Sequence, residues 1–270
     1  MKRRTFLKNS GMAMGAMTAS PLFNSLSVND DDKIRMTDLH VHLTNNFTIE
    51  HAMDLARKRN VTFGIVEHPV SWAIKDDQIL EQYINFLSQY PVYIGLQPVE
   101  PGWSKNYSPE LLDRIDYILM DPQRVPMANG EVLEIWNFDT YVDDTEEFMK
   151  RYMDYTMQIL ENEPVDIFGW PLFLPVCIAR DYYTLWTEER MDMILTAAKK
   201  HDIAIEINDM SHTPHEAFIL KAKEMGLKFT FGSDSRNQNA GRLAYCKRIA
   251  EKCDLRTEDF FLPSRRVGQG

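Results

Sequence analysis

The residues best suited to chemistry lie in short motifs that follow apolar runs of the chain. The first motif, residues 38–42, holds His40 and His42 two positions apart. Because alternate side chains of an extended strand point to one side, both imidazoles can grip one divalent metal ion. Asp234, far along the chain, can supply a carboxylate to the same ion. A metal held in this way lowers the pKa of bound water to about 7, so the pattern predicts a hydroxide nucleophile at neutral pH.

Further candidates gather at the ends of the other apolar runs. Five of the seven histidines follow such runs, whereas His51 and His201 fall in predicted helices. We take as candidate site residues Glu67, His68, Gln97, Asp121, Trp170, Glu206, His212, His215 and Arg236, with Arg180 in the segment after the fifth run. Glu206 is expected to orient ligands or to act as a base. The alternative is that these histidines have a structural role and only form hydrogen bonds within the fold. For His212 and His215, the start of a helix would explain the local pattern.

The elements that must position these residues alternate regularly between apolar runs and helical stretches. The runs are residues 34–40, 61–67, 92–97, 115–120, 166–170, 203–207 and 228–232. Helices are predicted at 49–59, 76–89, 145–162, 188–201, 214–225 and 240–251, the fifth with Thr213 as its N-cap and Pro214 at its first position. Alternating β and α units predict a parallel sheet, so the chemistry is expected at the carboxyl ends of its strands.

Seven such units favour an α/β fold that closes into a TIM-like barrel, and an open doubly wound sheet is the alternative. Nothing in the body of the chain marks a second domain, so we assign residues 33–270 to the barrel. Residues 122–144 contain Asn129-Gly130 and are expected to form a loop or hairpin over the mouth of the barrel.

Four motifs, taken in order, resemble the polymerase and histidinol phosphatase (PHP) superfamily. They are Asp38-Leu39-His40-Val41-His42, Glu67-His68, Ile205-Glu206-Ile207-Asn208 and Gly232-Ser233-Asp234. The resemblance covers nearly the whole body of the chain. It implies a distorted seven-stranded (β/α) barrel and a metal-dependent phosphoesterase with two or three metal ions. His40, His42 and Asp234 match ligands of the family, and His68 matches the histidine that closes the second motif.

The chain departs from the family at several ligand positions. Gln97 stands where a bridging glutamate is usual, Asp121 lies in the region of a histidine, and Trp170 replaces the histidine of a Gly-His-Pro motif. Arg236 replaces the histidine of the last motif. The resemblance therefore implies at least one zinc, manganese or iron ion, held by His40, His42 and Asp234, and not the full set of three. Asp121 and His68 are the candidate ligands of a second ion.

Arg236 and several tryptophans indicate what kind of substrate such a site would take. A guanidinium binds a phosphate or carboxylate through paired hydrogen bonds, although Arg236 can instead pair locally with Asp234 or Asp209. Four of the five tryptophans follow apolar runs, where their faces can stack on a sugar or pack beneath a lid. The substrate is expected to be a small molecule that is anionic or derived from a sugar.

Composition and charge limit the remaining classes of function. The 270 residues are 44% hydrophobic, which is typical of a globular protein and excludes disorder as the dominant state. The chain holds 30 Lys and Arg against 40 Asp and Glu, a net charge of −10. An acidic body repels nucleic-acid phosphates, so we expect no nucleic-acid partner. The oligomeric state is left open by the sequence.

The N-terminal segment has the pattern of an export signal. Arg3-Arg4 is followed by Phe6-Leu7-Lys8 and by a mildly apolar stretch at 11–19, which resembles a twin-arginine signal of bacteria. This resemblance implies the twin-arginine export machinery as a partner and export across the inner membrane. The protein would then be periplasmic, or anchored to the membrane by an uncleaved signal. Residues 1–32 are assigned to this signal and a polar linker.

The sequence therefore favours an exported, metal-dependent hydrolase of the PHP type, acting on a phosphoester through metal-bound water. Two other functions stay open. One is a catalytically degenerate barrel that binds a metal or a small ligand in the cell envelope. The other is a metal-dependent enzyme of different chemistry, either a hydrolase of a non-phosphate bond or a sugar isomerase.

Overall fold

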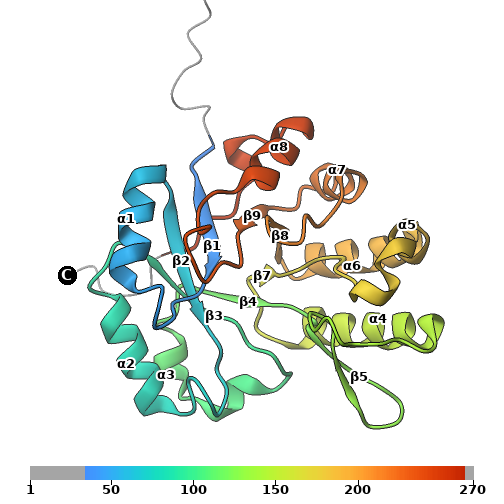
Figure 1. The fold of residues 1–270 in the computed structure, drawn as a ribbon, viewed down its shortest axis with the longest axis horizontal. Helices are drawn as coiled ribbons and strands as arrows, with labels where there is room; N and C mark the ends of the chain where they lie inside the picture. The colour runs from blue at the N-terminus through green and yellow to red at the C-terminus, as the bar shows by residue number, and fades with distance from the viewer. Residues whose placement is uncertain (1–33, 265–270) are drawn as a thin grey trace, which may run out of the picture. The chain divides into compact units, whose positions relative to one another are not determined.

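The computed structural model describes residues 34–264, and it is a barrel of parallel strands surrounded by helices (Figure 1). The predicted export signal and linker at 1–32 lie outside the described residues, as do Lys33 and residues 265–270 of the predicted barrel domain. In the part that is described, no helix is both long enough and apolar enough to span a membrane.

Seven strands form one sheet in which every neighbouring pair is parallel. In sheet order they are β1 (Thr37–Val41), β2 (Thr62–Glu67), β3 (Tyr93–Leu96), β4 (Tyr117–Met120), β7 (Ile167–Phe168), β8 (Ala204–Asn208) and β9 (Phe229–Gly232). All seven predicted runs are therefore strands. The sheet closes where Val41 forms a bridge with Ser235 just after β9, and the His42 N–H donates to the Ser235 carbonyl at 3.0 Å. This closure favours the barrel over the open sheet.

Helices follow the strands and lie around the outside of the barrel (Figure 1). The α-helices are α1 (Ile49–Arg59), α2 (Asp77–Leu87), α3 (Pro109–Leu112), α4 (Thr145–Asn162), α5 (Tyr182–Leu185), α6 (Glu188–Lys200), α7 (Glu216–Glu224) and α8 (Ala244–Lys252). The 3-10 helices are η2 (Trp103–Asn106), η3 (Val176–Asp181) and η4 (Thr257–Asp259). Side chains cap the helices that cover the mid-chain strands: Asp76 accepts from the Ile79 N–H and Asp144 from the Glu146 and Glu147 N–H groups.

Two helices start later than the sequence predicts. The cap predicted at Thr213 is wrong, because Thr213 pairs with Asn208 at the end of β8, and α7 begins at Glu216 after His215. α8 begins at Ala244 rather than at Ala240, because its cap comes from elsewhere in the chain. The Asp209 carboxylate accepts from the N–H groups of Tyr245 and Cys246 at 2.7 and 3.2 Å.

The segment at 122–144 contains the expected hairpin. β5 (Arg124–Pro126) pairs antiparallel with β6 (Val132–Glu134), and Gly130 in the turn has φ +85°, a conformation that favours glycine. Trp136 and Phe138 follow β6 and line the large cavity of the barrel. The hairpin therefore borders the mouth, as the sequence predicts.

The barrel interior is filled by a cluster of buried apolar side chains that includes Tyr117. Tyr117 of β4 is fully buried and donates from its hydroxyl to the Leu39 carbonyl of β1 at 2.7 Å, across the interior. Its ring lies against Gly64 and Gly95, where a Cβ atom would collide with it. Because Tyr117 occupies this interior, space for a ligand is left at the carboxyl ends of the strands.

Candidate metal centre

His40, His42 and Asp234 meet at the carboxyl end of the barrel, where β1 and the loop after β9 adjoin. His40 Nε2 lies 3.3 Å and His42 Nε2 3.5 Å from the same Asp234 Oδ1. The three ligand atoms all lie within 4.8 Å of one another, and all three residues are buried. The strand and the loop thus bring together the two histidines and the carboxylate that the sequence predicts as ligands.

This group fits a divalent metal ion. Both Nε2 atoms are buried and have no hydrogen-bond partner among the described residues, which is unusual for buried polar atoms. Two imidazole nitrogens and a carboxylate are the ligands that zinc, iron and manganese accept in proteins. The residues could hold such an ion, and they do not settle which metal it is.

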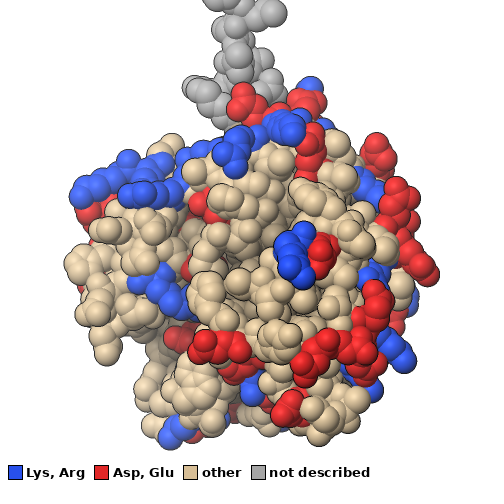
Figure 2. All heavy atoms as spheres, turned by 45° about the vertical axis from the view of Figure 1, so that its right-hand side comes forward, with Lys and Arg blue, Asp and Glu red and all other residues tan. Residues whose placement is uncertain are grey.

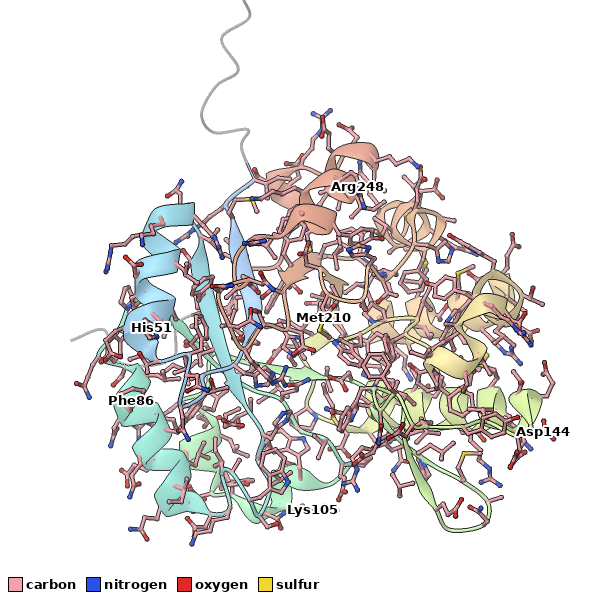
Figure 3. All side chains as sticks on the ribbon, in the orientation of Figure 1. His51, Phe86, Lys105, Asp144, Met210 and Arg248 are labelled. Carbon is pink, nitrogen blue, oxygen red and sulfur yellow. The ribbon has the colours of Figure 1, made fainter. Side chains whose placement is uncertain are left out.

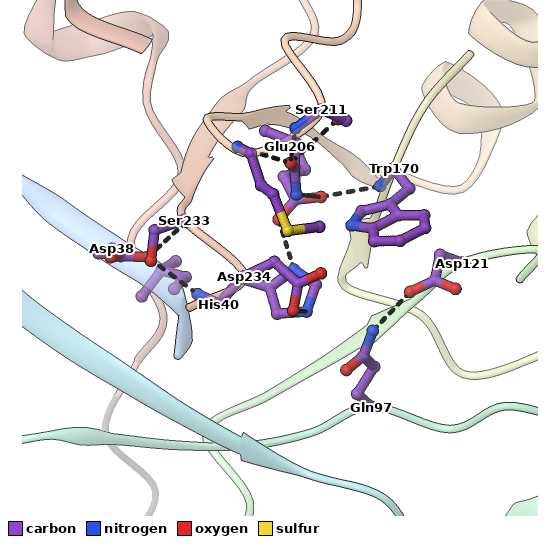
Figure 4. Close-up of polar contacts among 12 residues, drawn as sticks. Asp38, His40, Gln97, Asp121, Trp170, Glu206, Ser211, Ser233 and Asp234 are labelled. Carbon is purple, nitrogen blue, oxygen red and sulfur yellow. Dashed lines mark hydrogen bonds and ion pairs between the residues drawn. The ribbon is translucent and has the colours of Figure 1, made fainter. Parts of the chain in front are cut away.

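The carboxylate of Glu206 supports His40 from behind. Its Oε1 lies 2.7 Å from His40 Nδ1, and its Oε2 accepts from the Trp170 N–H at 2.8 Å and from Asn208 Nδ2 at 3.2 Å (Figure 4). A carboxylate on one imidazole nitrogen sets the tautomer that leaves the other nitrogen free for a metal. Both oxygens of Glu206 are engaged, so its geometry is that of an orienting group rather than of a base.

Asp38 holds the loop that carries Asp234, a role that the sequence analysis missed. Its Oδ1 accepts from the Ser233 N–H at 2.8 Å and its Oδ2 from the Gly241 N–H at 2.7 Å. Asp38 lies in the same motif as the two histidines, and its carboxylate contacts the backbone of the loop after β9. Its alternation with His40 and His42 would not by itself reveal this partner loop, which follows almost 200 residues later.

A second group of ligands shares His42 with the first. His42, Glu67 and His68 also place ligand atoms within 4.8 Å of one another. His68 donates from Nδ1 to the Gln97 carbonyl at 2.9 Å, so its Nε2 carries the free lone pair. Burial raises the pKa of Glu67 and lowers that of His68. Glu67, a candidate site residue in the sequence, is therefore a possible ligand of a second metal ion that shares His42.

Asp121 lies outside both groups and pairs with Gln97. The Gln97 amide nitrogen donates to Asp121 Oδ2 at 2.6 Å, and both side chains are buried in the wall of the cavity (Figure 4). Burial raises the pKa of Asp121 to about 7, and the hydrogen bond from Gln97 opposes that rise. Asp121 belongs to neither group of possible ligands among the described residues, so its role as a ligand stays a prediction.

The charges of the first group are strongly coupled. Burial would lower the pKa of His40, but the carboxylates of Asp234 and Glu206 outweigh it and raise that pKa to about 9. For His42, burial and the neighbouring charges of His40 and Arg236 lower the pKa to about 3. Burial acts against ionisation of Asp234, yet the two histidines and Arg236 hold its pKa well below the usual range. Without a metal at neutral pH, His40 is thus protonated and forms an ion pair with the Asp234 carboxylate, while His42 is neutral.

Arg236 takes the local pairing that the sequence left open. Its Nη1 donates to Asp234 Oδ1 at 2.7 Å, the same oxygen that faces both imidazoles. The guanidinium side chain is 46% exposed and lines the cavity. Arg236 can therefore reach an anion in the cavity while it touches a metal ligand.

The metal centre lies at a cavity of about 1060 Å³. Its wall includes His68, Gln97, Asp121, Trp170, Asp234 and Arg236 from the predicted set. Trp170 is buried, has φ +46° and packs its ring on Phe173 with centroids 4.4 Å apart. Met210 and Ser211, which follow β8, also line the cavity and were not predicted. No sequence signal marks them, because their only relevant property is their place in that loop.

Arg180, His212 and His215, which are among the candidate site residues, do not line the cavity. Arg180 lies in η3 with an 87% exposed side chain beside Asp181. His212 stacks on the Tyr245 ring with centroids 4.8 Å apart, and His215 pairs with the Tyr182 hydroxyl at 3.2 Å. Each histidine thus contacts tyrosine rings, and neither belongs to the two groups of possible metal ligands.

Comparisons with known proteins do not identify a family. No protein-family model matches the sequence, and no curated protein does. Among solved structures, the chain is similar to the HpcH/HpaI aldolase of Desulfitobacterium hafniense DCB-2, at 12% identity over 81% of this chain and 94% of that one, with a TM-score of 0.38. At this TM-score the likeness decides neither fold nor chemistry, which rest on the geometry described above.

Proposed function

We propose that this barrel is a metal-dependent hydrolase of phosphoesters. The observation that carries the proposal is the pair of buried imidazole nitrogens, His40 Nε2 and His42 Nε2, beside a cavity. Neither makes a hydrogen bond among the described residues, and both face the same Asp234 oxygen, at 3.3 and 3.5 Å. Free histidine nitrogens and a carboxylate are costly to bury unless they hold an ion. The resemblance of the four strand-end motifs to the PHP superfamily favours a phosphoester as the substrate.

Each residue of the site has a separate part in this function. His40, His42 and Asp234 would hold a divalent cation, with Glu67 and His68 available for another that shares His42. Such an ion, when bound, supplies an activated water and polarises a phosphoryl oxygen. Glu206 is a positioning residue, because it holds His40 with Nε2 toward Asp234. Arg236, at the cavity wall, would bind a phosphoryl oxygen through its guanidinium.

One observation favours a second candidate function, the catalytically degenerate barrel that only binds a ligand. Arg236 donates to the Asp234 oxygen that a metal would need, and Gln97, which stands where the family usually has a bridging glutamate, donates to Asp121. A cationic group on a ligand oxygen weakens the attraction of that oxygen for a cation. In this second function, Arg236 and the histidines would bind an anion without turnover.

The metal content of the purified protein separates the two functions. The full chain is purified without chelators, its metals are measured by mass spectrometry, and the protein is reloaded with zinc, manganese or iron. We expect at least one equivalent that the variant His40→Ala/His42→Ala loses, and release of phosphate from a panel of phosphoesters. His51→Ala is the matched control, since His51 lies on α1 at the outer edge of the molecule (Figure 3).

The outcomes of this experiment are distinct. No bound metal after reloading would rule out the hydrolase and leave the ligand-binding barrel. Bound metal with turnover of other substrates, but of no phosphoester, would point to a non-phosphate hydrolase or a sugar isomerase. Bound metal without any turnover would favour the degenerate barrel.

A further inference from the structure

Large apolar side chains are exposed around one cavity. Five residues of this kind line the cavity of the metal centre: Trp72 (72% exposed), Trp136 (46%), Phe138 (84%), Val176 (57%) and Met210 (55%). They come from four separate segments, which follow β2, β6, β7 and β8. Met210 lies near the centre of the view down the barrel (Figure 3). Exposed apolar groups that gather at one concave surface usually mark a binding site.

The rest of the described surface shows no comparable grouping of exposed apolar side chains around a cavity. The face that is turned forward in Figure 2 is mostly uncharged, with a basic and an acidic group side by side near its middle and most other charged groups toward its edges. Elsewhere in the described chain, large exposed apolar residues such as Phe86 and Tyr183 lie on other elements. The five residues at the cavity are thus a local concentration, which we call the vestibule.

The vestibule is joined to the metal centre by a row of rings. The Trp72 ring lies 5.4 Å from the His68 ring, His68 stacks on His42 at 5.1 Å, and His42 lies 5.4 Å from His40. A group that stacks on Trp72 therefore lies two rings from His42, one of the central ligands. One small molecule can therefore contact Trp72 with one end and reach the metal centre with the other.

The size of the cavity requires a substrate larger than its reacting group. Cavities of about 300–1000 Å³ hold whole drug-sized ligands. The cavity of this protein, at about 1060 Å³, has room for a phosphoryl group and for a substantial organic part. Because Arg236 and the metal ligands account for the anionic end, the vestibule is left for the organic part.

We propose that the vestibule binds a ring of the substrate, either the C–H face of a sugar or an aromatic ring, while the phosphoester lies at the metal centre. Indole and phenyl faces attract such rings through stacking, and they do so without fixed hydrogen-bond partners. Two exposed tryptophans and a phenylalanine supply three such faces around one opening. The inference rests on the proposed function for the position of the phosphoester, and it adds the class of group to which the phosphoester is attached.

The test measures binding of phosphonates, which are not hydrolysed. The manganese-loaded full chain is titrated by calorimetry with phenylphosphonate, the methylenephosphonate analogue of glucose 6-phosphate, n-hexylphosphonate and methylphosphonate. Uncharged phenyl β-D-glucoside is a fifth probe that does not need the metal centre. We expect one of the two ring-bearing phosphonates to bind at least about tenfold more tightly than the n-hexyl and methyl compounds. Which of the two binds more tightly shows whether the vestibule prefers a sugar ring or an aromatic ring.

Variants connect this preference to the vestibule. Trp72→Ala and Trp136→Ala should each reduce the preference for the ring by roughly tenfold, because stacking is lost. Trp72 is 72% and Trp136 46% exposed, and neither belongs to the buried core, so their removal should leave the fold intact. Tyr141→Ala and Tyr183→Ala are matched controls: both rings are at least 70% exposed and neither lines the cavity, so the preference should be unchanged.

Each other outcome decides a different point. If n-hexylphosphonate binds as tightly as the ring compounds, or if the tryptophan variants behave like the tyrosine controls, the vestibule does not select rings and the inference is wrong. If no phosphonate binds, but the glucoside binds and depends on Trp72, the vestibule stands and the phosphoester function fails. If no probe binds at all, both proposals are overturned.

Discussion

Glu206 makes His40 a better metal ligand than the bare sequence pattern suggests. It is fully buried, it accepts three hydrogen bonds if His40 donates from Nδ1, and Gly232 beside it has no room for a Cβ atom. A buried carboxylate with this many partners is held in one place. It therefore holds the His40 ring in one orientation as well.

Replacing Glu206 with glutamine should weaken metal binding without unfolding the barrel. The amide keeps the shape of the side chain but removes the negative charge behind His40, and partners of this kind contribute about 10–100-fold to metal affinity. We expect a loss of that size in a competition titration against a chelator. Glu100→Gln changes an exposed carboxylate of the same cavity, and its affinity should match the parent protein. Equal affinities for all three proteins would contradict the positioning role.

Metal affinity should also depend on pH through His40. In the metal-free protein the pKa of His40 is about 9, so at pH 7 the metal must displace a proton from it. The pKa of His42, about 3, means that this ring is already neutral. Affinity for manganese should thus rise by about tenfold for each pH unit between pH 7 and 8.5 and then level off above pH 9. An affinity that stays constant over this range would show that His40 is neutral without the metal.

At the scale of elements, the metal centre depends on how β1 meets the loop after β9. The two are joined by one bridge, Val41 with Ser235, and by the two hydrogen bonds that Asp38 accepts. Asp234 has φ +45° in this loop, a conformation that a non-glycine residue rarely adopts. The loop therefore needs the Asp38 contacts to present Asp234 to the histidines.

Replacing Asp38 with asparagine should both destabilise the fold and loosen the metal centre. The carboxylate accepts from two N–H groups on opposite oxygens, whereas an amide can accept from only one and turns a donor toward the other. A buried unsatisfied donor costs about 1–3 kcal/mol, so the melting temperature should fall by several degrees, with weaker metal binding.

Asp209→Ala is the control for this change, because it removes the single carboxylate oxygen that accepts from two N–H groups at the start of α8. It should lower the melting temperature of the metal-free protein and leave metal affinity unchanged. If both variants lose metal affinity equally, general destabilisation and not the Asp234 loop would explain the effect.

For the whole molecule, the charge and the N-terminal motif lead to expectations that reach beyond the barrel. The net charge is −10, whereas the first residues are basic and include Arg3 and Arg4. We propose that this segment directs export of the folded protein by the twin-arginine route. It lies outside the described residues, so the proposal rests on its sequence.

Changing Arg3 and Arg4 together to lysine should keep the protein inside the cell. The double substitution preserves the positive charge but removes the arginine pair on which the resemblance depends. Cell fractionation and immunoblotting measure the result in a bacterial host that has the twin-arginine machinery. Lys2→Arg/Lys8→Arg is the charge-matched control and should be exported. Normal export of the lysine variant would exclude the twin-arginine route.

Much of the fold followed from local patterns in the sequence. A β-strand and an amphipathic helix show their periods within about ten residues, so β2 and α4 could be predicted closely. The histidine pair on β1 could be predicted for the same reason, since side-chain alternation is a property of the strand alone. The start of α8 was misplaced because its cap is Asp209, a residue about 35 positions earlier.

The sequence by itself therefore determined seven βα units and the residues at their carboxyl ends. Only the tertiary structure decided that β1 closes on β9, that Asp234 meets both histidines, and that Asp38 and Glu206 support them. It also placed His212 and His215 against tyrosine rings and gathered four separate segments into the vestibule. The physical reason is that these contacts join residues far apart in the chain. Their partners depend on packing and burial in three dimensions, which no local period encodes.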